Sequence, residues 1–246
     1  MKLHYLAKIK LILLLLMSCV SFVTSPVTSA ESLSSQSKPK IGIIGAGWLG
    51  GTVGKAWIRS GYQVMFSTRH PDKLQSMVTQ LGAKASLGTP REAAAFGDII
   101  LIAVPYSSIE QISRDFEPEL KGKIILDATN AHDGPDQASK DAVDHGVAVT
   151  SAKYFKYARL VRAFSAVDAT AIEASSLRNS HKLGVPLASD DPQAMAIAKK
   201  LVIDAGCTPV IVGDLSKAHM FERGNPGFRA NTTAPVLREI LGLADD

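Results

Sequence analysis

The sequence is poor in cysteine and has no stretch in which charge of one sign accumulates. Two cysteines occur among 246 residues, and only Cys207 lies beyond the first 30 positions. A fold stapled by disulfide bonds is therefore excluded for the main part of the chain. Basic residues exceed acidic ones by only four charges and are dispersed, without runs of lysine and arginine interleaved with aromatics. We expect no nucleic-acid partner.

Disorder is excluded by the balance of apolar and charged residues. Hydrophobic residues make up 46% of the chain and charged residues 20%. A chain of this length and composition can bury a substantial core, so we expect a globular α/β protein without internal repeats.

The first 30 residues differ in composition from the rest. Three lysines precede an apolar run at residues 11–17, and small residues at 28–30 precede Glu31. This pattern predicts a secretory signal peptide, and the run is too short for a membrane span. We therefore expect an exported protein, periplasmic or extracytoplasmic, in which a flexible leader at 31–39 connects to the fold.

Two other interpretations of this segment stay open. Translation from Met17 would give a cytoplasmic protein, and a lipidated Cys19 or a retained leader would give membrane attachment. Export would separate the protein from its cofactor supply, because nicotinamide cofactors belong to a cytoplasmic pool. The sequence does not decide among these alternatives.

A glycine motif follows the first apolar run of the main chain. Gly45, Gly47 and Gly50 form G-x-G-x-x-G directly after the β-branched residues 41–44. In dinucleotide-binding proteins, the first glycine allows the tight turn, the second lets the backbone approach the pyrophosphate, and the third lets the helix pack closely on the strand. A helix at 48–60, Gly61 as its stop and a second strand at 63–67 complete the expected Rossmann unit.

The end of the second strand favours NADP(H) over NAD(H). NAD-selective sites place a carboxylate about 20 residues after the glycines, on the ribose 2′-hydroxyl. Here Thr68 and Arg69 occupy the place, and the first carboxylate is Asp72. A hydroxyl and a planar guanidinium suit a 2′-phosphate. His70 either flanks this phosphate or caps the next helix.

The alternation of strands and helices predicts a doubly wound parallel sheet. Residues 40–150 form the expected NADP-binding Rossmann domain, and residues 151–246 form a small C-terminal α/β extension of the same sheet, with a helical tail at 216–242. The further strands are expected at 84–86, 98–104, 123–129, 160–164, 183–188 and 208–212. The further helices are expected at 71–81, 90–96, 107–117, 169–175 and 192–205.

Six segments together resemble the NADPH-dependent reductases of the deazaflavin coenzyme F420, and the reductase domain of the six-transmembrane metalloreductases is similar. The segments are 41–50, 67–69, 102–105, 127–130, 161–165 and 185–191. The resemblance implies an oxidoreductase that passes a hydride between NADP(H) and a flavin or deazaflavin. In such a reaction the protein supplies geometry and the cofactors supply the chemistry.

The resemblance also implies roles for individual residues. Thr68 and Arg69 would hold the 2′-phosphate. Val104 and Pro105 would border the ribose and nicotinamide, with Asn130 and Ala163 near the nicotinamide ring. The full cofactor-binding set is Gly45, Ala46, Gly47, Trp48, Leu49, Gly50, Thr68, Arg69, Val104, Pro105, Asn130 and Ala163.

No catalytic acid or base and no metal site is expected. Asp127 more often orients a loop at a strand end than acts as a base. Tyr106 either walls the nicotinamide pocket or packs in the core, and Cys207 is expected to be a small buried residue. The four histidines His132, His145, His181 and His219 lack metal-ligand spacing and are expected on the surface or in loops.

Two rival functions remain. An imine or β-hydroxyacid reductase shares such a first half, but usually appends a long helical domain, and fewer than 100 residues follow Thr150 here. A non-enzymatic NADP(H) sensor would lack a pocket for an acceptor. The expected partner is a small-molecule redox acceptor, and a homodimer is possible.

Overall fold

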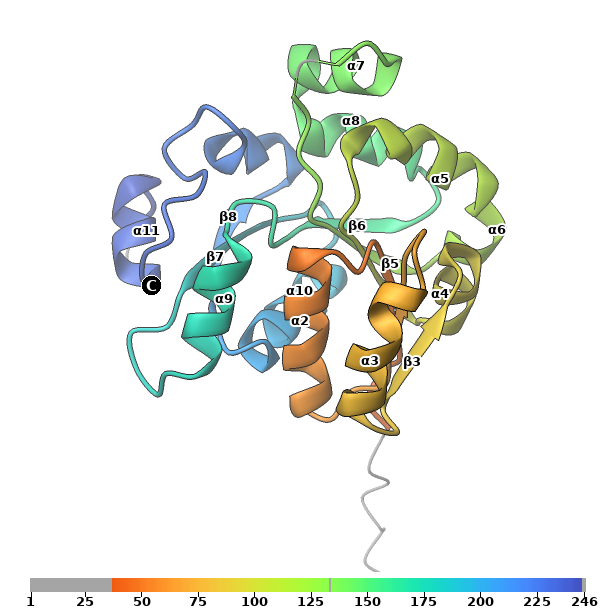
Figure 1. Ribbon diagram of the computed structural model, residues 1–246. Coiled ribbons are helices and arrows are strands. Elements are labelled where there is room, and N and C mark those ends of the chain that lie inside the picture. The colour runs from red at the N-terminus through yellow and green to blue at the C-terminus, as the bar shows by residue number, and fades with distance from the viewer. Residues whose placement is uncertain (1–36, 133, 245–246) are drawn as a thin grey trace, which may run out of the picture. The chain divides into compact units, whose positions relative to one another are not determined.

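A computed structural model describes residues 37–132 and 134–244, so the expected signal peptide lies outside the described residues. The core is one eight-stranded sheet with strand order β3-β2-β1-β4-β5-β6-β7-β8 (Figure 1). The first six strands follow the order expected of a dinucleotide-binding fold. Their bounds are β1 Ile41–Ile44, β2 Val64–Ser67, β3 Ala85–Gly88, β4 Ile99–Ile102, β5 Ile124–Asp127, β6 Arg159–Arg162, β7 Gly184–Ala188 and β8 Thr208–Gly213.

The sheet is parallel from β3 to β6, as predicted, but its last two strands run the other way. Strands β6 and β7 are antiparallel and pair only through Arg162 and Ala188, the final residue of each strand. Strand β7 therefore runs from beyond the carboxyl end of β6 back toward it, and β8 pairs with β7 in parallel. The expectation of a parallel sheet is wrong for this pair, because the apolar pattern of a strand carries no information on its direction.

Helices cover both faces of the sheet, so its central strands are buried throughout. One apolar core contains Ile43, Leu101 and Trp57 of helix α2, and the other contains Ile44, Ile102 and Tyr106. The helices are α2 Trp48–Arg59, α3 Asp72–Leu81, α4 Pro90–Phe96, η1 Tyr106–Ser108, α5 Ile109–Asp115, α6 Glu117–Leu120, α7 Gln137–His145, α8 Val147–Tyr154, α9 Ala169–Ser176, α10 Pro192–Asp204, η2 Leu215–Phe221 and α11 Ala234–Ile240.

Two helical regions differ from expectation. The helix predicted at 107–117 is divided into η1, α5 and α6, and α7 and α8 fill a region that carried no predicted helix. Asp136 caps α7 by accepting a hydrogen bond from the Ser139 N–H at 2.8 Å, a local signal that marks a helix start. Among residues 37–132 and 134–244, no helix has the length and apolarity needed to cross a membrane.

Candidate functional site

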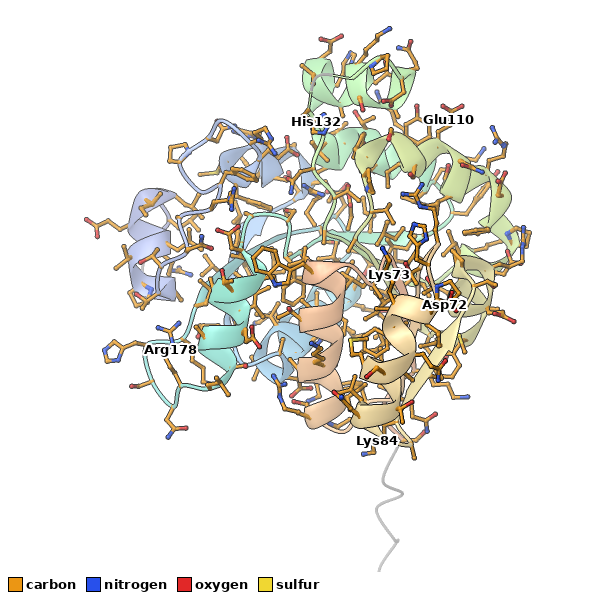
Figure 2. All side chains as sticks on the ribbon, in the orientation of Figure 1. Asp72, Lys73, Lys84, Glu110, His132 and Arg178 are labelled. Atoms are coloured by element: carbon orange, nitrogen blue, oxygen red, sulfur yellow. The ribbon has the colours of Figure 1, made fainter. Side chains whose placement is uncertain are left out.

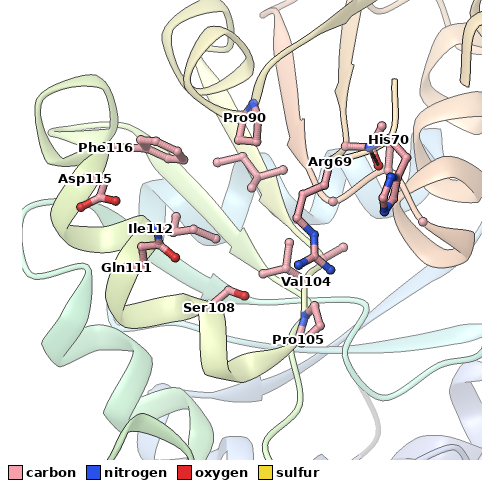
Figure 3. A pocket seen from close by; sticks show the side chains of 16 residues that line it. Arg69, His70, Pro90, Val104, Pro105, Ser108, Gln111, Ile112, Asp115 and Phe116 are labelled. Carbon is pink, nitrogen blue, oxygen red and sulfur yellow. Dashed lines mark hydrogen bonds between the residues drawn. The ribbon is translucent and has the colours of Figure 1, made fainter. Parts of the chain in front are cut away.

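A cleft of about 430 Å³ opens at the carboxyl ends of β1, β2 and β4 (Figure 3). This is the edge at which doubly wound sheets bind their ligands, where the strand order reverses. The glycine loop, the loop after β2, the segment after β4 and helix α5 line it. The lining residues are Ile44, Gly45, Ala46, Gly47, Thr68, Arg69, His70, Pro90, Ala103, Val104, Pro105, Ser108, Gln111, Ile112, Asp115 and Phe116.

The three motif glycines have different surroundings. Gly45 has φ +99°, and a Cβ there would lie 2.4 Å from the carbonyl oxygen of Ala103. A Cβ on Gly50 would lie 2.4 Å from the carbonyl oxygen of Gly45, so this glycine allows the loop and helix to pack. A Cβ on Gly47 would meet no protein atom within 4 Å. Gly47 is therefore not required by packing, and open space for a ligand beside the backbone is the remaining reason for a glycine there.

The start of helix α2 offers free backbone donors to this cleft. Gly47 is the N-cap residue of α2, and no side chain caps its first turn. The Ala46 N–H instead donates to the Ser67 carbonyl at 2.8 Å, which fixes the loop against β2. Unsatisfied N–H groups and the helix dipole make such an N-terminus suited to a phosphate.

Basic side chains border the cleft after β2. Arg69 and His70 are both exposed and lie on one wall, whereas Asp115 and Phe116 lie on the opposite wall, at the end of α5 (Figure 3). Asp115 is the only carboxylate among the lining residues, and Arg114 pairs with it at 3.1 Å. The wall expected to receive the 2′-phosphate therefore has cationic or neutral donors and no acid.

The wall formed by α5 was not predicted to line the cleft. Ser108, Gln111 and Ile112 contribute to it, and Pro90 of α4 closes another side. The sequence predicted helices at 107–117 and 90–96. The residue pattern of a short helix does not indicate whether that helix lines a cleft.

Other predicted cofactor residues lie beside the cleft rather than in its lining. Trp48 is 72% exposed at the first position of α2, Leu49 packs partly buried against the core, and Gly50 is buried. Asn130 and Ala163 follow β5 and β6 at the same edge of the sheet. The Asn130 side-chain amide donates to the Ser165 carbonyl at 2.7 Å, which joins the loops after these two strands.

Five buried polar atoms at the ends of β5 and β6 have no hydrogen-bond partner among the described residues. Two lie in the loops, Asn130 Oδ1 and Ser165 Oγ, and three belong to the buried ion pair behind them, Asp127 Oδ2 and Arg162 Nε and Nη2. A buried polar atom left unpaired costs free energy, so such atoms call for a ligand or an ordered water. An acceptor oxygen and a hydroxyl donor match the two halves of a carboxamide. The pair fits the nicotinamide end of NADP(H).

Asp127 holds the loop that carries Asn130. Its Oδ1 accepts hydrogen bonds from the N–H and hydroxyl of Thr129, at 3.0 and 2.6 Å. Its Oδ2 lies 3.0 Å from Nη1 of Arg162, and both side chains are fully buried. Arg162 Nη1 also donates to the Thr129 carbonyl at 2.8 Å. The expectation that Asp127 orients a loop matches these contacts, whereas nothing in the sequence indicated that Arg162 is buried.

The chain turns sharply after β6. Phe164 has φ +62° although it is a bulky residue, a conformation that costs free energy and persists only where the surroundings impose it. Its buried ring packs edge-on against Trp57 of α2, with ring centroids 5.9 Å apart. This packing holds Ala163 and Ser165 on either side of the turn at the edge of the sheet.

Tyr106 and Cys207 are packing residues. Tyr106 is buried and its hydroxyl lies 3.2 Å from Ser151 Oγ, so the interpretation as a pocket wall is wrong. Burial raises the pKa of this phenol above its ordinary value. Burial also raises the pKa of the Cys207 thiol to about 11. That thiol stays neutral at physiological pH, which excludes it as a nucleophile.

Three of the four candidate histidines line the same cavity. His132, His145 and His219 line a second cavity, whereas His181 is exposed on a loop elsewhere. The described residues contain no group of three or more histidine, cysteine or acidic side chains with metal-binding geometry. The convergence joins residues far apart in sequence, so no local spacing could have revealed it.

Comparison with known proteins agrees with this geometry. Residues 40–131, which contain the glycine loop, the Arg69 wall and Asn130, match the family model "NADP oxidoreductase coenzyme F420-dependent". This segment is therefore similar to that family. Metalloreductase STEAP3 of Rattus norvegicus is 26% identical over 203 residues, which cover 80% of this chain and 38% of that protein. The chain spans less than half the length of the curated relatives it matches.

Solved structures share the fold over most of the chain. A hypothetical protein from Sinorhizobium meliloti has a TM-score of 0.69 and 25% identity, covering 81% of this chain and 97% of its own. A protein proposed to be an F420-dependent NADP reductase, from Arthrobacter, has a TM-score of 0.62 and 21% identity, covering 84% of this chain and 96% of its own. The family match and the reductase relatives support an NADP-dependent oxidoreductase.

Proposed function

We propose that the protein transfers a hydride between NADP(H) and a flavin or deazaflavin acceptor. The observation that carries the proposal is the nicotinamide end of the site. Asn130 Oδ1 and Ser165 Oγ are unpaired there, while the nearby acid Asp127 is fully buried, with Oδ1 bonded to Thr129 and Oδ2 ion-paired with Arg162. The site can orient a ring but offers no free carboxylate among these residues for proton transfer.

The chain's own groups divide the work of binding. Thr68, Arg69 and the first turn of α2 would bind phosphate groups, and Val104 and Pro105 would border the ribose. Asn130 and Ser165 would fix the carboxamide, which sets the face of the nicotinamide that is presented. Bound NADPH supplies a hydride, which together with one proton from water reduces a flavin-type ring. Such a reaction is accelerated mainly by proximity and orientation.

An anaerobic assay of NADPH oxidation tests the reaction. Purified protein would be supplied in turn with riboflavin, a deazaflavin, a ferric chelate and a cyclic imine. We expect turnover with the flavin-type acceptors. A Ser165→Ala variant should raise the KM for NADPH, with a Ser180→Ala variant in an exposed loop as control. Turnover with the imine alone would contradict the proposal.

The assay also separates the two rival functions. An imine reductase from Myxococcus stipitatus shares the fold at 17% identity and a TM-score of 0.55, and this chain covers 60% of it. In the described residues after Thr150 the chain adds strands to the sheet, and its helices there have at most 13 residues, so no long helical domain is present. A sensor would bind NADPH without turning over any of the four acceptors.

A further inference from the structure

A second cavity, of about 630 Å³, lies beyond the Asn130 loop. Ala131 and His132 form one wall directly after Asn130, α7 and α8 form another, and η2 with the turn after it forms the third. Figure 2 shows His132 at the base of α7. Residues 130–132 connect Asn130 to the wall of this cavity. A molecule whose reactive end lies beside Asn130 can therefore place its other end in the cavity.

The cavity is lined mainly by groups that favour an anion. His132, His145, His219 and Arg223 are exposed lining residues. Glu222 is the only carboxylate among the lining residues. Both of its oxygens are already engaged, since they accept the Val147 and Ala148 N–H groups of α8 at 3.1 and 2.9 Å. The Glu222 carboxylate thus interacts with the start of α8. The lining residues include no other carboxylate that would repel an anion.

The hydrogen bonds of His145 and His219 determine which ring nitrogen can contact a ligand. His145 Nδ1 lies 3.0 Å from the Asp141 carbonyl, and His219 Nδ1 lies 2.7 Å from the Ser216 carbonyl. A carbonyl only accepts, so Nδ1 carries the hydrogen in both rings and Nε2 remains for a ligand. When the ring is protonated, Nε2 donates as well.

Arg223 adds a fixed positive charge. Its guanidinium lies over the Phe228 ring, with Cζ 5.2 Å from the ring centroid, and it forms no ion pair with an acid among the described residues. A guanidinium supported by a ring keeps its donor edge free for a planar or tetrahedral anion.

We propose that this cavity binds an anionic, phosphate-type group at the tail of the electron acceptor. The inference rests on the proposed function, because the acceptor ring would lie at the nicotinamide end of the site. It narrows the acceptor to a flavin-type molecule whose side chain ends in a negative charge, in preference to a neutral one.

FMN and riboflavin provide the test, because they differ only by the terminal phosphate. Binding of each would be followed by quenching of flavin fluorescence in protein saturated with NADP+, which fills the first cleft. We expect FMN to bind about tenfold or more tightly than riboflavin, as a charge-assisted hydrogen bond allows. Arg223→Gln and His219→Gln should each reduce the preference, and Arg223→Gln should leave riboflavin binding unchanged.

Arg178→Gln and His181→Gln are matched controls, since both residues are exposed on the loop after α9. Figure 2 shows Arg178 far from His132. Equal binding of FMN and riboflavin, or equal weakening of both by Arg223→Gln, would overturn the inference and leave the hydride-transfer function intact. If neither flavin binds or is reduced, the proposed function fails. The site is then tested by titrating inorganic phosphate against the histidine NMR signals, where an absence of shifts at His132, His145 and His219 overturns it.

Discussion

Nη1 of Arg162 lies 3.0 Å from Oδ2 of Asp127, and neither side chain is exposed to solvent. The same nitrogen also binds the carbonyl oxygens of Asp127 and Thr129, so one guanidinium ties the ends of β5 and β6 to the Asn130 loop. Buried charges are tolerated only when they are paired, and the pair is costly to break from one side.

Replacing Asp127 with Asn should therefore act mainly on stability. The change leaves the Arg162 charge buried and without its counter-ion, which typically lowers the free energy of unfolding by about 3–5 kcal/mol. Urea unfolding measures the loss. The exposed Asp144→Asn provides the control and should change stability by no more than about 0.5 kcal/mol. A variant that is fully stable but about 100-fold slower in turnover would instead indicate acid-base catalysis by Asp127.

Replacing Arg69 with Ala should discriminate between the two nicotinamide cofactors. Arg69 borders the cleft after β2, where the 2′-phosphate is expected. Loss of a charged hydrogen bond should weaken NADPH binding by about 1.5–3 kcal/mol and leave NADH binding nearly unchanged. Calorimetry with both cofactors measures this, with Arg178→Ala as control. Equal losses for NADPH and NADH would mean that Arg69 does not bind the 2′-phosphate.

Trp48 should report cofactor binding by fluorescence. The chain has two tryptophans, and Trp57 is fully buried whereas Trp48 is 72% exposed beside Gly47. NADPH bound at the start of α2 should shield Trp48 and lower its quenching by acrylamide. Trp48→Phe should remove this response and leave the emission of Trp57. Unchanged quenching on saturation with NADPH would place the cofactor elsewhere.

Asp191 should stabilise the fold in a pH-dependent way. Its carboxylate accepts hydrogen bonds from Nε and Nη2 of Arg159, at 2.5 and 2.9 Å. The same carboxylate caps α10 by accepting hydrogen bonds from the N–H groups of Gln193 and Ala194. The hydrogen bond from Arg159 and those from the helix start hold the pKa of Asp191 well below its ordinary value. The ionised form is thus favoured by folding, so its contribution is present above the unfolded pKa of about 4 and is lost as the pH falls below it.

Asp191→Asn keeps a capping side chain and removes the charge. Wild type and variant should differ in urea unfolding at pH 7, and the difference should shrink progressively below pH 4. A difference that stays constant with pH would show that the charge contributes nothing to folding.

The sequence predicted the part of the fold that local patterns encode. The apolar runs of β1 and β4, the glycine loop and the basic end of β2 each follow from residues that are neighbours in the chain. The reversal of β7, the burial of Arg162 and the presence of His132 and His219 in the lining of one cavity depend on which distant segments come together. Such contacts are set by packing of the whole sheet, and no periodicity within one element reports them.

Helix α2 is held in place by residues from the C-terminal half of the chain. Trp57 Nε1 donates to the Leu201 carbonyl of α10 at 2.8 Å and its ring meets Phe164, while α9 packs alongside α2. Helix α2, for which we propose phosphate binding, therefore forms one compact unit with α9 and α10 in the described residues, without a division into two lobes. We therefore expect cofactor and acceptor to enter and leave without the closure of one domain on another.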